Sequence, residues 1–93
     1  MVSRMIGRGN MKRPNILWEL KEKSQAIIED LGEKIPAKFQ LRLGELGLLK
    51  SQPITCLKKT PFNGPILYQV GDGVISLARE VAENIYITRK KNG

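Results

Sequence analysis

The sequence predicts a mainly β fold, a small barrel with one helix inserted after the first strand. Four or five short apolar runs at near-regular spacing are typical of such a barrel. One segment between the first two runs has a helical period, and Pro- or Gly-rich turns separate the later runs. With 93 residues, the chain is long enough for one domain and one core, but a roomy catalytic cleft is harder to accommodate.

The first strand is expected at residues 25–30, where Gln-Ala-Ile-Ile-Glu-Asp is short and rich in Ile. A lead-in turn or short helix at residues 16–20 precedes it. This segment contains Trp18, which we expect to pack over the open end of the barrel rather than to stack on a base or a partner. Leu31-Gly32-Glu33 is typical of a turn, so the strand is expected to end before it.

The helix is expected to follow this turn. Pro36 suits the first position of a helix, and Gly47 is a natural stop at its carboxyl end. Gly44, inside the helix, costs about 1 kcal/mol relative to Ala, which indicates close packing there. One face carries apolar residues four, four and three positions apart: Ile35, Phe39, Leu43 and Leu46. We therefore expect Leu43 and Leu46 to lie in the core.

The second half of the chain is expected to supply the remaining strands, at residues 54–60, 66–70, 74–77 and 84–88. In the second of these, Ile66, Tyr68 and Val70 share one face because side chains alternate along a strand. Gly71-Asp72-Gly73 is typical of a tight hairpin turn. Residues 78–82 are expected to form one helical turn before the last strand.

The net charge of +7 is confined to the two ends of the sequence. Residues 14–88 contain nine basic and nine acidic residues, so the body is neutral. We expect a flexible basic N-terminal extension at residues 1–14, a domain at residues 15–88 and a basic C-terminal tail at residues 89–93. Basic tails are attracted to anionic membrane surfaces, and nucleic acids would use the same charges through counterion release.

The residue types present disfavour catalysis and metal binding. The chain has no His and a single Cys, Cys56, which excludes an internal disulfide and is expected to be a buried structural thiol. Glu29, Asp30 and Glu33 lack the spacing and ligand number of a cation cage, so a solvated acidic edge is expected. Because no nucleophile accompanies a base and no phosphate-binding loop is present, we expect no enzyme activity, no cofactor and no metal site.

Three motifs occur in a fixed order along the body of the chain. They read Arg-Leu-Gly-Glu-Leu-Gly-Leu at 42–48, Pro-Phe-Asn-Gly-Pro-Ile at 61–66, and Ser-Leu-Ala-Arg-Glu-Val-Ala-Glu-Asn-Ile at 76–85. In these motifs, and over roughly residues 17–87, the chain resembles the FeoA family, the small cytosolic accessory proteins of bacterial ferrous iron transport. The resemblance implies an SH3-like β-barrel with a helical insertion after the first strand.

The chain departs from the family pattern in two turns. Lys23-Ser24 stands before the first strand, where the family often has glycine. Lys50-Ser51 stands after the first motif, where the family often has Pro-Gly. These differences concern the local geometry of the turns and leave the expected fold unchanged.

The resemblance also implies a partner, the membrane-embedded FeoB-type ferrous iron transporter, which carries a cytosolic G-domain. We expect contacts from a helix-end segment and from a loop: Leu46, Gly47, Leu48 and Leu49, and Pro61, Phe62, Asn63, Gly64 and Pro65. The leucines could instead fill the core, although two adjacent leucines are not easily both buried, so one of Leu48 and Leu49 is expected to be exposed. The loop could instead be a rigid turn with Phe62 folded inward, and both alternatives stay open.

The favoured hypothesis is therefore a non-enzymatic cytoplasmic protein that acts at the inner face of the membrane. No apolar run is long enough to span a bilayer, and no secretory signal is visible. One alternative is a nucleic-acid-binding barrel that uses the basic ends, which the neutral body disfavours. Another is a metal-linked regulatory domain, which the absence of His disfavours. Exposed edge strands also indicate weak homo-oligomerisation.

Overall fold

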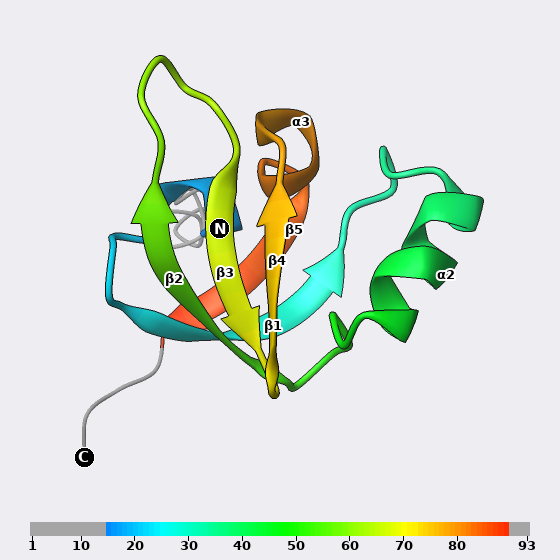
Figure 1. Cartoon of the computed structure of the whole chain (residues 1–93). Helices are drawn as coiled ribbons and strands as arrows, with labels where there is room; N and C mark the ends of the chain where they lie inside the picture. The colour runs from blue at the N-terminus through cyan, green and yellow to red at the C-terminus, as the bar shows by residue number, and fades with distance from the viewer. Residues whose placement is uncertain (1–14, 90–93) are drawn as a thin grey trace, which may run out of the picture.

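The computed structural model describes residues 15–89. The extension expected at residues 1–14 lies outside this range, as does the C-terminal tail after Arg89. Arg89 itself, which we expected to begin the tail, is the last residue of a strand. Figure 1 shows a strongly curled sheet with one helix set against its side.

The predicted mainly β fold with a helix after the first strand is confirmed. The five strands form one antiparallel sheet in the order β4-β3-β2-β1-β5, and α2 is the inserted helix (Figure 1). The elements in chain order are η1 (Leu17–Glu19), β1 (Gln25–Leu31), α2 (Ala37–Glu45), β2 (Pro53–Lys59), β3 (Ile66–Val70), β4 (Gly73–Leu77), α3 (Arg79–Ala82) and β5 (Ile85–Arg89). The predicted boundaries therefore agree with the structure to within one or two residues.

Two register shifts bend the sheet around a single core. One lies between Ile28 and Asp30, where β1 pairs with β5, and the other between Cys56 and Lys58, where β2 pairs with β3. Such irregularities increase local twist, which allows a short sheet to curl. The largest fully buried side chains are Tyr68, Leu17, Ile28, Leu48, Ile54, Ile66, Ile85 and Cys56.

Tyr68 ties the lead-in segment to the sheet. Its hydroxyl donates a hydrogen bond to the carbonyl oxygen of Leu17 at 3.3 Å, and burial raises the pKa of this hydroxyl well above its ordinary value. Ile66, Tyr68 and Val70 are all buried, so the predicted inward face of β3 is confirmed. Trp18 packs against this core.

The carboxyl end of α2 is a Schellman motif. The Gly47 N–H donates to the Gly44 carbonyl at 3.0 Å, and the Leu48 N–H donates to the Leu43 carbonyl at 3.0 Å. Gly47 has φ +105°, a conformation that favours glycine. The predicted stop is confirmed, and the motif brings Leu48 into the core beside Leu43.

The prediction that Leu46 lies in the core is wrong. Leu46 is 49% exposed and Phe39 is 42% exposed, whereas Leu43 and Ile35 are buried. Leu43 is the sole buried residue of α2. Because the chain reverses at Gly47, Leu48 takes the core position that the helical period assigned to Leu46.

The two turns that depart from the family pattern both contain a non-glycine residue in the left-handed region. Lys23 has φ 69° and Ser51 has φ 75°. This conformation costs an L-residue about 1–2 kcal/mol, and glycine adopts it freely. Both turns therefore have the backbone geometry that glycine favours, although Lys23 and Ser51 occupy these positions.

We expect Ser51→Gly to raise the free energy of unfolding by about 0.5–1 kcal/mol, since the relief of strain exceeds the added entropy of the unfolded chain. The Ser51 N–H that donates to the Ile28 carbonyl at 2.7 Å is retained in the variant. Urea unfolding of the variant beside the wild type measures the change. Ser51→Ala, which keeps the strain, is the control, and equal stability of the two variants would contradict the prediction.

Candidate functional site

The two predicted contact segments lie at opposite ends of β3. A Cβ built on Gly47 would come within 3.0 Å of Val70 Cγ1, which places the helix-end segment at the last residue of β3. The loop of residues 61–65 instead precedes Ile66, the first residue of the same strand (Figure 1). The structure therefore does not bring the two segments together into one surface.

The helix-end segment is only partly accessible. Leu48 is fully buried, so its side chain is not available to a partner in this fold. Leu46 and Leu49 are about half exposed, at 49% and 52%. The expectation that one of the two adjacent leucines is exposed is thus confirmed, and the exposed one is Leu49.

Leu49 borders a groove between α2 and β1 of about 370 Å³, here called the α2 groove. Leu31, Leu41 and Leu49 supply apolar walls, and Gly44 lies so close that an added Cβ would meet Leu49 Cδ2 at 3.3 Å. Leu41 is 69% exposed and was missed by sequence reasoning, because it falls off the apolar stripe of the helix. The helical period identifies residues on the apolar face, so it gives no sign of an exposed apolar residue outside that face.

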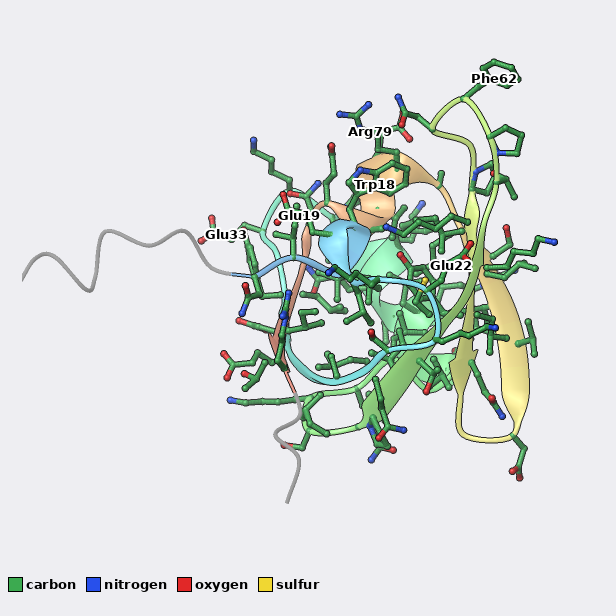
Figure 2. All side chains as sticks on the ribbon, turned by 90° about the vertical axis from the view of Figure 1, so that its left-hand side faces the viewer. Trp18, Glu19, Glu22, Glu33, Phe62 and Arg79 are labelled. Carbon is green, nitrogen blue, oxygen red and sulfur yellow. The ribbon has the colours of Figure 1, made fainter. Side chains whose placement is uncertain are left out.

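Phe62 points outward from the loop between β2 and β3. Its side chain is 98% exposed, and Figure 2 shows it at the tip, away from the rest of the molecule. The alternative in which Phe62 folds inward is therefore wrong. An almost fully exposed Phe is unusual for a folded chain, since large apolar side chains are normally at least half buried.

The backbone under Phe62 is strained. Phe62 has φ 59° and Asn63 has φ 58°, and the Gly64 N–H donates to the Pro61 carbonyl at 3.1 Å. Two consecutive positive φ angles define a type I′ turn, which normally takes Asn-Gly at these positions. A bulky residue with positive φ is a true outlier, and such outliers cluster at functional sites.

Contacts on both sides hold the loop in this conformation. The Thr60 hydroxyl donates to the Pro65 carbonyl at 2.7 Å, across the base of the loop. A Cβ at position 64 would lie 2.6 Å from the Thr60 Oγ1, so only glycine fits there. The Lys59 N–H donates to the Glu22 carboxylate at 2.6 Å, which fixes the end of β2. The exposed ring is therefore presented on a preorganised support.

Trp18 lies against the core with one face covered by a cation. Figure 2 shows Arg79 beside Trp18, and the Arg79 guanidinium carbon is 5.4 Å from the ring centroid. The Arg79 Nε donates to the Glu83 carboxylate at 2.7 Å. This arrangement is a cation–π contact braced by an ion pair. It agrees with a packing role for Trp18.

Glu29 and Asp30, at the predicted acidic edge, accept hydrogen bonds. The Thr88 hydroxyl donates to Glu29, and the Asp30 carboxylate accepts the Leu31 N–H at 2.9 Å.

Cys56 is buried as predicted, and burial raises the pKa of its thiol. Between residues 15 and 89, no cluster of three or more acidic or Cys side chains is arranged to hold a metal ion. Within the same range, no helix is both long and apolar enough to cross a membrane.

Comparison with known proteins gives a family and a fold. The family model described as the FeoA domain matches residues 17–89. The structure of FeoA from Chlorobium tepidum is similar, with a TM-score of 0.74 and 24% identity over 81% of this chain and 70% of that one. No curated protein matches the sequence.

Two further structures show how widely this fold is used. FeoA from Stenotrophomonas maltophilia, in complex with zinc, has a TM-score of 0.68 and 28% identity over 78% of this chain and 88% of that one. It is described as a prokaryotic SH3 domain protein and as a candidate activating factor of ferrous iron transport. A manganese-dependent transcriptional repressor has a TM-score of 0.74 at 13% identity, with 85% of this chain covering 38% of the repressor. The SH3-like fold predicted for this chain is confirmed.

Proposed function

The chain belongs to the FeoA family, and from this membership we propose that it is a non-enzymatic accessory protein of ferrous iron uptake. It binds the cytosolic portion of a FeoB-type transporter and modulates transport through protein–protein contact. This proposal places it in the cytoplasm at the inner face of the membrane. The description of the Stenotrophomonas maltophilia protein as a candidate transport activator supports it.

The observation that carries a contact role is the Phe62 loop. Aromatic side chains are enriched at the centres of interfaces, where they fill apolar pockets of the partner. Phe62 is 98% exposed on a loop fixed by the Thr60–Pro65 hydrogen bond, with prolines at positions 61 and 65. A preorganised loop loses little conformational entropy on binding. We assign the main contact with the transporter to this loop.

The α2 groove is a separate surface, because it lies at the other end of β3 from the loop. Leu41 and Leu49 expose apolar area there, and a large partner could cover both surfaces at once. Leu49→Asp therefore tests the groove, just as a change at Phe62 tests the loop.

Uptake of labelled ferrous iron in cells lacking this protein tests the proposal. We expect uptake to fall, to be restored by the wild type, and to stay low with Phe62→Ser. A pull-down with the transporter's cytosolic portion, with and without nucleotide, provides the direct readout. Unchanged uptake together with no recovered complex would contradict a role of this protein in iron transport.

A further inference from the structure

We propose that the outer edge of β4 pairs with the same edge of a second copy, joining two sheets antiparallel around a twofold axis. Such pairing does not depend on the transporter. In the sheet order, β4 is the last strand and pairs only with β3 among the described strands. The outer side of β4 is therefore the place where the sheet can continue.

The register shows which backbone groups point outward. Val70 and Gly73 close a two-residue hairpin, and such a closing pair is hydrogen-bonded. Because bonded and non-bonded pairs alternate, Ile75 is bonded to β3, while the N–H and C=O groups of Val74 and Ser76 face away from it. No other described segment bonds to the backbone of either residue.

Within residues 15–89, the edge at β5 is covered and the edge at β4 is open. On β5, Ile16 forms a bridge with Tyr86, and the Ile87 N–H donates to the Asn15 carbonyl at 3.0 Å. β4 has no charged residue, no proline and no register shift, and these are the usual devices that prevent edge pairing. Val74 is 58% exposed.

A second copy of β4 fits this edge because the strand is self-complementary. With Ile75 opposite Ile75 of the partner subunit, Val74 lies opposite Ser76 of the partner subunit. The outward backbone N–H and C=O groups of these two residues then face each other, and this pair occurs twice in the dimer because of the twofold axis. The two Ile75 side chains, which are β-branched, oppose each other at the centre. The Asp72 end of each strand then lies beside the Arg79 end of the other. Arg79 bonds Glu83 through Nε, and its guanidinium carries further N–H donors.

Sedimentation equilibrium from micromolar to millimolar protein tests the pairing. We expect a reversible monomer–dimer equilibrium for the wild type and for Ser76→Ala. Ser76→Pro removes the outward N–H without removing a bond to β3, and edge strands tolerate proline. We expect it to weaken the dimer about tenfold or more, since two hydrogen bonds are lost per dimer. Val74→Lys, which adds a charge to the edge, is expected to do the same without a change in backbone.

Amide hydrogen exchange identifies the surface involved. The amides of Val74 and Ser76 should become protected as the protein concentration rises, whereas the amide of Ile75 is protected at all concentrations. A wild type that stays monomeric at millimolar concentration overturns the proposal. So does a dimer that forms without protecting these two amides, and so does an edge that takes up an extended segment of another protein but never a second copy.

Discussion

Replacing Leu48 with Asp is expected to unfold the domain rather than to disrupt a docking surface. Leu48 is fully buried and packs in the core with Leu43. Loss of a buried Leu side chain costs about 2–5 kcal/mol, and an unpaired buried carboxylate adds several more. A domain of this size is stable by only about 5–10 kcal/mol. The far-UV circular dichroism spectrum of the variant should therefore be that of an unfolded chain at 25 °C.

Leu49→Asp is the matched control, because it introduces the same charge one position further along the chain. Leu49 is 52% exposed, so its carboxylate stays hydrated and the cost should be within about 1 kcal/mol. Urea unfolding of the two variants measures the difference. If Leu48→Asp folded with wild-type stability, the buried position of Leu48 would be wrong.

The strands could be predicted because their signals are local. Alternation of Ile66, Tyr68 and Val70 assigns the inward face of β3, and glycines mark the hairpin that follows. The stop at Gly47 is equally local, since a Schellman motif needs a residue that tolerates positive φ. Such features depend on a few neighbouring residues, so they can be predicted without knowledge of the tertiary structure.

The burial of α2 could not be predicted from its period. A helical stripe identifies residues that share a face, but the neighbouring elements decide how much of that face is covered. Here Leu43 alone is buried, and Phe39 and Leu46 stay near half exposed. The orientation of Phe62 was likewise open, because a type I′ turn over Phe-Asn contradicts the usual residue preference.

Phe62→Gly is expected to stabilise the isolated domain and to weaken its binding to the transporter. Glycine removes the strain of a bulky residue at φ 59°, which stabilises the folded domain by about 1–2 kcal/mol. The greater conformational entropy of glycine in the unfolded chain offsets about 0.5–1 kcal/mol of this gain. The free energy of unfolding should therefore rise by up to about 1 kcal/mol. Truncation of an aromatic hot spot costs at least about 2 kcal/mol of binding, so Kd should rise about 30-fold.

The opposite signs of these two changes distinguish a contact residue from a structural one. Asn63→Gly relieves the neighbouring φ of 58° but keeps the ring, so it should retain the wild-type Kd. Phe62→Asn removes the ring but introduces a residue that tolerates positive φ without the added backbone freedom of glycine. Its Kd should therefore rise as much as that of Phe62→Gly. Titration calorimetry with the transporter's cytosolic portion and urea unfolding give both quantities. If Phe62→Gly lost stability, the ring would be supporting the fold. If it gained stability and kept its affinity, the strain would need an explanation other than binding.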